Sequence, residues 1–228
     1  MILSMYTLCL EPENPLQFSA DELRLFLNKK LAAYMEHHRS DAAGFIHRYP
    51  VLQCKQVKGD LIVIGISQGA GCLSEITRDE TLVGAGESTC LITDRDPAIR
   101  PEPFGMRESL STFEFQTPWI ALNQQYAKKF YDLKGKPHRD AFMQNLLSTT
   151  LHSLAKSLDY EIPEPIVCEA KVRFRRDRIG RENVMVFLGK FRTNLDIPDC
   201  LGIGRSVSQG YGTIKHITES PGIYSGDP

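Results

Sequence analysis

The pattern of hydrophobic and polar residues along the first hundred positions predicts strands and helices in the order of one compact motif. Residues 1–10, MILSMYTLCL, are rich in Ile and Leu and precede the proline-containing EPENP, which indicates that a strand ends there. Ser19 and Glu22 have the spacing of a capping box, and apolar residues then recur at helical spacing to about His37. The remaining expected elements are strands at 45–57 and 61–67 joined by the turn KGD, a short helix at 71–79 and a strand at 81–86.

This order of strand, helix, strand, strand, helix and strand is that of the ferredoxin-like fold, and the second half of the chain predicts it again. The second series is a strand at 111–122, a helix at 139–158, a hairpin at about 166–194 and a last strand at 210–217. A glycine-rich stretch takes the place of the second helix. We therefore expect an α+β protein with two tandem ferredoxin-like (βαββαβ, RRM-like) domains, the second with a glycine-rich loop in place of its last helix.

The domain boundaries are expected at a stretch that lacks periodicity. Residues 94–110 are charged and contain three prolines, which is typical of a linker or a long connection. The expected domains are then 1–93 and 111–228. The second of these carries both a basic hairpin and the glycine-rich loop.

Composition excludes several classes of protein. The chain has 228 residues, 42% hydrophobic and 24% charged, as in an ordinary soluble globule. It contains no run of roughly 20 apolar residues and does not begin like a signal peptide, so a cytoplasmic location without a membrane partner is expected. The six cysteines lie far apart with no CxxC pair, which indicates reduced thiols and neither a zinc site nor a disulfide framework. We expect no cofactor.

Charge is distributed unevenly although its sum is only −1. The segment 171–192 contains eight basic and two acidic residues. In its first strand, KVRFRR, the basic side chains alternate with Val172 and Phe174, so a cationic face is expected. Such a ribbon suits a nucleic-acid backbone, and the alternative is an edge strand protected by charge. The residues of this hairpin predicted to bind RNA are Lys171, Arg173, Arg175, Arg176, Arg178, Lys190 and Arg192.

The glycine-rich stretch 201–217, LGIGRSVSQGYGTIKHI, matches neither standard nucleotide-binding loop. A dinucleotide fingerprint counted from Gly202 would need glycine where Val207 stands, and a phosphate loop would need a glycine and a lysine in other positions. The remaining interpretations are a tight structural turn, or a bare backbone that an anionic polymer can approach. We favour the second, with RNA contacts expected from Gly202, Gly204, Arg205, Ser206, Ser208, Gly210 and Gly212.

The six histidines are the candidates for proton transfer near neutral pH. His37 and His38 end the first predicted helix, where stabilisation by the helix dipole is the alternative explanation. No HxH or HxxxH pattern with a carboxylate ligand is present, so chemistry by these residues would be metal-free. RNA cleavage suits such a site, because the 2′-OH of the substrate supplies the nucleophile.

Three segments together resemble one known family. LDIPDCLGIGRSVSQGYGTIKHI resembles the glycine-rich signature of the CRISPR-associated precursor-CRISPR-RNA endoribonucleases, the sixth Cas family. HRYPVLQCKQVKGDLIVIGISQGA and FEFQTPWIALNQQYAKKF resemble two further blocks of its branch in type I-B and type III systems, in the same order.

The resemblance implies a repeat-specific nuclease of antiviral defence. Members bind the repeat of a precursor CRISPR RNA and cut it without metal, leaving a 2′,3′-cyclic phosphate and a 5′-hydroxyl. The hairpin would then engage the RNA, and the catalytic histidines map onto His38 and His37. We expect Arg48 or an arginine of the hairpin to stabilise the phosphate. This chain reads MEHHRS, with Glu36 where related members have the first of two spaced histidines.

Two other functions and several partners stay open at this stage. A non-catalytic module that holds repeat or processed RNA would use the same fold. An unrelated RNA-recognition domain is disfavoured, because no RNP-type aromatic pattern occurs. The resemblance is also compatible with assembly into an interference complex of the Cascade or type III kind, or into a homodimer.

Overall fold

The computed structural model describes residues 1–12, 23–30, 49–80, 82–85, 88–96, 98–179 and 182–218. Its first unit is an antiparallel sheet in the order β2-β3-β1-β5-β4, with β6 paired to the remaining length of β1. Two helical segments, 23–30 and α2, pack on one face of this sheet. The elements are β1 (Ile2–Pro12), β2 (Leu52–Val57), β3 (Asp60–Ile66), α2 (Gln68–Ile76), β4 (Leu82–Ala85), β5 (Ser88–Arg95) and β6 (Arg100–Pro103).

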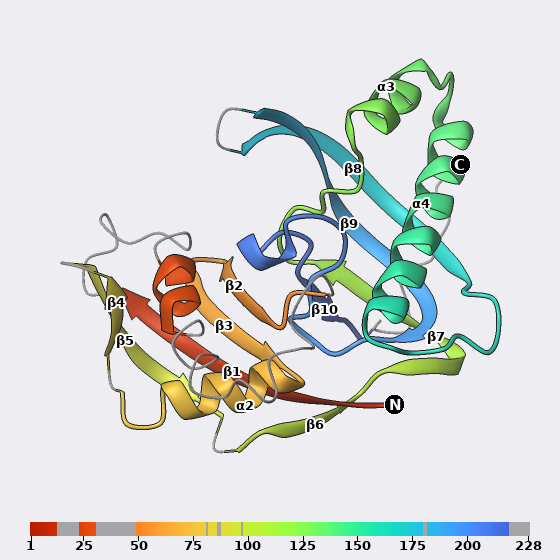
Figure 1. The fold of residues 1–228 in the computed structure, drawn as a ribbon. Helices are drawn as coiled ribbons and strands as arrows, with labels where there is room; N and C mark the ends of the chain where they lie inside the picture. The colour runs from red at the N-terminus through yellow and green to blue at the C-terminus, as the bar shows by residue number, and fades with distance from the viewer. Residues whose placement is uncertain are drawn as a thin grey trace.

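The second unit is an antiparallel sheet in the order β10-β7-β9-β8, with α4 along one face (Figure 1). Its elements are β7 (Gly105–Phe115), α3 (Gln124–Asp132), α4 (Lys136–Ser157), β8 (Cys168–Ile179), β9 (Glu182–Asp196) and β10 (Ile214–His216). The 3-10 turn η2 (Val207–Gln209) stands in the glycine-rich stretch. Neither α4 nor any other helix in the described part of the chain has the length and apolarity that crossing a membrane requires.

The strand orders confirm the predicted tandem ferredoxin-like fold. In the second unit β7 and β9 are central, with β8 beside β9 and β10 beside β7. In the first unit β1 and β3 are central and β2 lies beside β3, but the strand beside β1 is β5, which was not predicted, and the expected strand 81–86 is the outer strand β4. In the second unit a 3-10 turn of three residues replaces the last helix, as expected. The structure adds a helix that the sequence reading missed, α3, whose first turn is capped by the Asn123 side chain accepting from the Tyr126 N–H at 2.9 Å.

Residues 94–110 differ from the expected irregular connection, because most of them are strand. β1 has 11 residues, and β5 pairs with one end of it and β6 with the other. Pro101 and Pro103 are tolerated because alternate residues of a strand turn their N–H to the partner, and the even-numbered positions do so here. The Phe104 N–H accordingly donates to the Met1 carbonyl oxygen at 3.0 Å.

The first sheet is buried on both faces, and this joins the two units. Along β3, Leu61 and Val63 pack with the helices of the first unit, whereas Ile64 and Ile66 belong to the core of the second unit. That second core also contains Trp119, which is fully buried and stacks on Phe115 at 5.2 Å. The period-2 alternation of one strand therefore serves two cores.

Because this core is shared, we expect the two units to unfold together. Ile64→Ala should lower the free energy of unfolding by about 2–5 kcal/mol. Urea unfolding would be followed by fluorescence of Trp119, the single tryptophan, and by far-UV circular dichroism. Both transitions should shift by the same amount, and an unchanged fluorescence transition would show that the units are independent. Leu91→Ala, at an exposed position of β5, is the control.

Candidate nucleic-acid interface

The glycine-rich loop, residues 200–213, lies between the two units and is hydrogen-bonded to both. On the side of the second unit it contacts the segment that follows β7. The Gly212 N–H donates to the Pro118 carbonyl oxygen at 2.8 Å, and the Arg205 N–H donates to that of Ile120 at 3.1 Å. The Thr117 hydroxyl donates to the Gly210 carbonyl oxygen at 2.6 Å. The segment 117–120 thus holds the loop along much of its length.

On the side of the first unit, the loop contacts the chain that leads into β2. The Tyr49 hydroxyl donates to the Gly202 carbonyl oxygen, and the Gly202 N–H donates to Gln53 Oε1 at 3.2 Å. Burial raises the pKa of the Tyr49 hydroxyl above its ordinary value, so this group remains a donor at neutral pH. The three segments in which the sequence resembles one family therefore meet at this loop.

Glycine is required at several positions of this loop for a reason that the sequence did not reveal. Gly202, Gly210 and Gly212 are buried. A Cβ atom at Gly212 would lie 2.0 Å from the Ile203 carbonyl oxygen, and one at Gly210 would lie 2.9 Å from that of Cys54. Both residues also have positive φ, 66° and 86°, which favours glycine. These glycines let the loop pack closely within the protein.

The part of the loop that faces solvent is its middle. Gly204 and Arg205 are exposed, and Ser206 and Ser208 are half-buried. Ser206 adopts the left-handed conformation with φ 56°, immediately before η2. Of the predicted contacts in this loop, these four residues are therefore the ones whose side chains or backbone a polymer can reach.

A buried lysine forms the centre of the junction. The Lys55 side chain is fully buried, and its Nζ donates to Gln53 Oε1 at 2.8 Å and to Thr213 Oγ1 at 3.2 Å. The Thr213 hydroxyl in turn donates to the Gly210 carbonyl oxygen at 3.0 Å. Among the described residues no carboxylate forms an ion pair with Lys55. Burial consequently lowers the pKa of the Lys55 amine from 10.5 to about 7.

Sequence reasoning missed this network because Gln53 and Lys55 look like the exposed face of a strand. They alternate with Leu52 and Cys54, the pattern of a half-buried strand. In the structure β2 is an edge strand of its sheet, but the glycine-rich loop covers the face that carries these two side chains. The one sequence feature that could have indicated a role for Gln53 and Lys55 is their place inside one of the three segments that resemble a known family.

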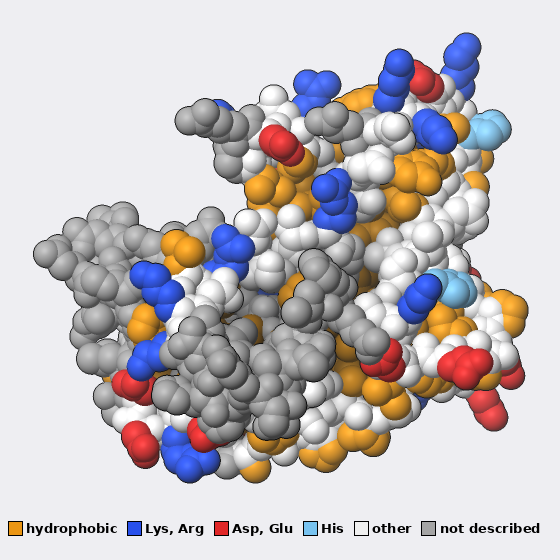
Figure 2. Space-filling view, viewed as in Figure 1, with side chains coloured by type: hydrophobic (Ala, Val, Ile, Leu, Met, Phe, Trp, Pro, Cys, Tyr) orange, Lys and Arg blue, Asp and Glu red, His pale blue; other side chains and the backbone are white. Residues whose placement is uncertain are grey.

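The basic hairpin of β8 and β9 has the two faces that the alternation predicted. Lys171 stands opposite Lys190 in the register and both are exposed, while Phe174 packs edge-on against Phe130 of α3 at 5.5 Å. Figure 2 shows Lys and Arg side chains over the lobe that carries α3 and the far end of this hairpin. Like charges directly opposite one another on a sheet are destabilising, and an anion bound between them would relieve that repulsion.

The other predicted cations of the hairpin differ in their partners. Arg192 forms an ion pair with Glu169 at 3.3 Å, and Arg175 forms one with Asp177 at the same distance. The Arg176 Nε donates to the Tyr131 hydroxyl at 3.5 Å, on the face that carries Phe174. Arg173 and Arg178 are exposed.

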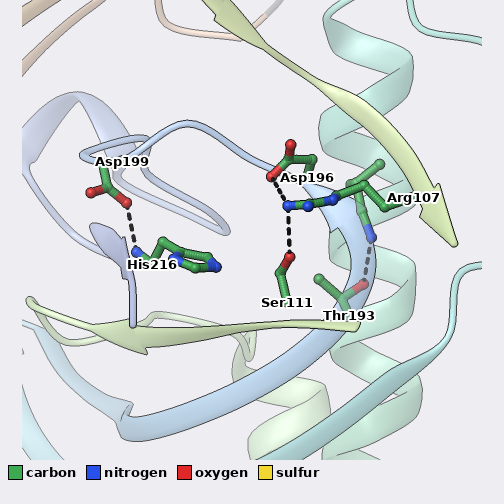
Figure 3. A network of polar contacts seen from close by, with 7 residues as sticks. Arg107, Ser111, Thr193, Asp196, Asp199 and His216 are labelled. Carbon is green, nitrogen blue, oxygen red and sulfur yellow. Dashed lines mark hydrogen bonds and ion pairs between the residues drawn. The ribbon is translucent and has the colours of Figure 1, made fainter. Parts of the chain in front are cut away.

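Carboxylates gather at a different place, in a cavity of about 610 Å³ between the two sheets. Arg107 reaches Asp196 at 3.4 Å and Ser111 at 3.2 Å, and Asp199 accepts from the His216 N–H at 2.6 Å (Figure 3). Arg100 pairs with Asp96 at 2.7 Å on the same side. The acidic residues that line this cavity are Asp94, Asp96, Glu102, Asp196 and Asp199. Five carboxylates against two arginines make this side unfavourable for a polyphosphate chain.

The predicted catalytic residues His37, His38 and Arg48 lie outside the described residues. The next residue in the chain, Tyr49, is the one bonded to the glycine-rich loop. Of the other histidines that the structure describes, His216 is exposed and its ring lies edge-on to Phe113 at 5.5 Å. The Nδ1 atoms of His138 and His152 donate to the backbone carbonyl oxygens of Lys134 and Ser148. No three His, Cys, Asp or Glu side chains within the described ranges are grouped so as to hold a metal ion.

The lowered pKa of Lys55 makes the stability of the junction depend on pH. Between about 7 and 10.5 the unfolded chain binds a proton at this amine that the folded chain does not, so stability rises with pH there. This group adds up to about 1.4 kcal/mol for each pH unit. Urea unfolding at pH 7.5 and 8.5 should show a larger increase for the wild type than for Lys55→Met. Equal increases in both proteins would contradict a neutral buried amine.

Comparisons with known proteins agree with this architecture. A model of the Cas6b N-terminal domain matches residues 1–98, and a model of the Cas6b C-terminal domain matches residues 105–217. An uncharacterized protein of Methanocaldococcus jannaschii is 30% identical over 128 residues, which are 53% of this chain and 82% of that protein.

Solved structures give the same picture. A crystal structure of Cas6b is 27% identical, covers 95% of this chain and 100% of that one, and has a TM-score of 0.78. A structure of the CRISPR RNA processing endoribonuclease Cas6b has the same identity and coverage and a TM-score of 0.68. A Cas6-related protein from Pyrococcus furiosus, 14% identical with a TM-score of 0.59 over 96% of this chain and 100% of that one, shares the fold. Because the two domain models match both units in chain order, this chain belongs to the Cas6b family.

Proposed function

We propose that this protein is a metal-independent endoribonuclease that binds CRISPR repeat RNA and cleaves precursor CRISPR RNA. The observation that carries the proposal is that the three segments that resemble the Cas6 family, which lie far apart in the sequence, meet in one buried network around the glycine-rich loop. The likeness to a CRISPR RNA processing endoribonuclease over 95% of the chain supports the same activity. The alternative is a module that binds the RNA without cutting it. The two functions predict the same RNA binding and differ only in whether the RNA is cleaved.

The chemistry requires three groups besides the RNA. One removes the proton of the 2′-OH, a second protonates the leaving 5′ oxygen, and a cation stabilises the charge on the phosphate. We assign the proton transfers to His38 and His37 and the cation to Arg48. The expected products are a 2′,3′-cyclic phosphate and a 5′-hydroxyl.

The RNA would be held by the cationic elements around the junction. These are the outer face of the hairpin, including Lys171, Arg173 and Lys190, and the exposed middle of the loop with Arg205. The acidic cavity lies between the sheets and would repel the polymer there. RNA is therefore expected to follow the hairpin and the loop. Assembly with an interference complex is proposed as a later step for the same RNA.

The cleavage mechanism can be tested with the repeat RNA of the host in EDTA. The RNA should be cut once, and the same RNA with a single 2′-deoxy residue at the cut site should remain intact. His38→Ala should slow single-turnover cleavage by about 100-fold or more, because general acid–base catalysis contributes that much. Tight binding without cleavage of either RNA would establish the binding module instead. Cleavage by His38→Ala at the wild-type rate would refute the assignment of His38.

The role of the hairpin can be tested by its salt dependence. Arg173→Ala should weaken binding of repeat RNA at every salt concentration and reduce the slope of log K against log salt by about 0.7 to 0.9, the value for one phosphate contact. Arg100→Ala removes the same charge on the acidic side and should leave the slope unchanged. Equal slopes for the wild type and Arg173→Ala would exclude a phosphate contact at Arg173.

A further inference from the structure

A second cationic surface lies behind the hairpin, away from the glycine-rich loop. It is an open cavity of about 840 Å³ formed by the end of α3, the turn before α4, the first turn of α4 and strand β8. Its volume falls within the range of about 300–1,000 Å³ usual for small-ligand sites. Of the described residues that line this cavity, Arg173 is the one that was predicted to bind RNA. Its neighbours on β8, Val172 and Phe174, also line the cavity but belong to the other face of the strand.

Aromatic rings are exposed in this cavity. Tyr131 is 44% exposed and Phe174 is 42% exposed, large fractions for aromatic side chains with neighbours on three elements. The two rings lie edge-on to each other at 6.3 Å, and Phe174 also packs edge-on against the buried Phe130. Phe130 supports Phe174 from below, so this ring has a fixed position while part of its surface stays open to solvent.

Cations surround these rings. Arg176 donates to the Tyr131 hydroxyl at 3.5 Å, and Arg139 lies over the Phe130 ring at 5.5 Å from its centroid. The basic residues that line the cavity are Lys134, Lys136, Arg139 and Arg173, and the acidic ones are Asp132 and Asp140. Figure 2 shows blue side chains around exposed hydrophobic ones on the lobe that carries α3. The N-terminus of the 22-residue helix α4 adds positive potential at the same place.

We propose that this cavity binds a single-stranded segment of RNA, with one base stacked on Tyr131, another on Phe174, and the flanking phosphates on the surrounding cations. Open rings within a positively charged surface are the features that bind single-stranded nucleic acid without regard to sequence. A protein interface would instead be expected to carry few charges at its centre. This inference rests on the proposed RNA-binding function. It extends the RNA path from Arg173 to the face of the hairpin that carries Val172 and Phe174.

The contribution of the rings can be measured with a fluorescein-labelled 12-residue oligouridine. Tyr131→Ala and Phe174→Ala should each weaken its binding about 10-fold, the loss typical of one stacked base. Tyr131→Phe keeps the ring but removes the acceptor of Arg176, so it should bind within about 2-fold of the wild type. Tyr126→Ala is the matched control, because Tyr126 is 43% exposed on the same helix but does not line the cavity.

The position of the RNA can be measured separately by crosslinking. Oligouridine that contains 5-iodouridine should crosslink on irradiation to Tyr131 or Phe174, as mapped by mass spectrometry of tryptic peptides. Circular dichroism of each variant would show that the fold is retained. Because crosslinking uses the wild-type protein, it also tests the proposal should Phe174→Ala fail to fold.

The outcomes separate this proposal from the proposed nuclease activity. Crosslinks at the rings and weaker binding by the alanine variants would support the cavity even if repeat RNA were not cut. Cleavage of repeat RNA together with wild-type affinity of both alanine variants and no crosslink at the rings would overturn the cavity alone. A change in sedimentation from dimer to monomer on Tyr131→Ala, with oligouridine binding unchanged, would show that the surface contacts a second copy and would also overturn it.

Discussion

The arrangement of the two units depends on the buried hydrogen bonds that join the glycine-rich loop to strand β2 and to the segment after β7. Gln53 and Lys55 contribute the side chains of β2, and Thr117 contributes one from the other unit. A buried polar group without a partner destabilises a fold by about 1–3 kcal/mol, so these groups are satisfied together or not at all. The loop must approach both units closely, and glycine is required wherever a side chain would fill that space. This network and the shared hydrophobic core together position the two sheets relative to each other.

The distribution of charge follows from that arrangement. The cavity between the sheets collects carboxylates, while the cations lie on the hairpin, on the exposed middle of the loop and beside α3. The junction itself carries an amine whose pKa is lowered to about 7, and no carboxylate pairs with it in the described part of the chain. The network can therefore remain nearly neutral in a protein whose partner is an anion. The net charge of −1 conceals a division of the surface into an acidic and a basic part.

Much of the fold could be predicted from local patterns. β1 and β3 are short apolar runs bounded by turn residues, α4 shows a leucine stripe, and β8 shows alternating basic and apolar residues. Each of these signals lies within one element. The prolines at 101 and 103 misled the reading of the stretch 94–110, since proline is compatible with an edge strand when its nitrogen faces away from the partner. Helix α3 was not predicted because its apolar face is short. That face packs against Phe174 of β8, a residue that lies far from α3 in the sequence.

The sequence by itself determined most of the elements, their order, and hence the tandem ferredoxin-like class, because these follow from periodicity and turn chemistry along the chain. It also located the cationic hairpin and the segments that resemble one family. Only the tertiary structure decided that Gly202, Gly210 and Gly212 pack inside the protein and that Gln53 and Lys55 are buried. The physical reason is that burial depends on what covers a face. For β2 that cover is a loop about 150 residues further along the chain, which no local pattern in β2 can indicate.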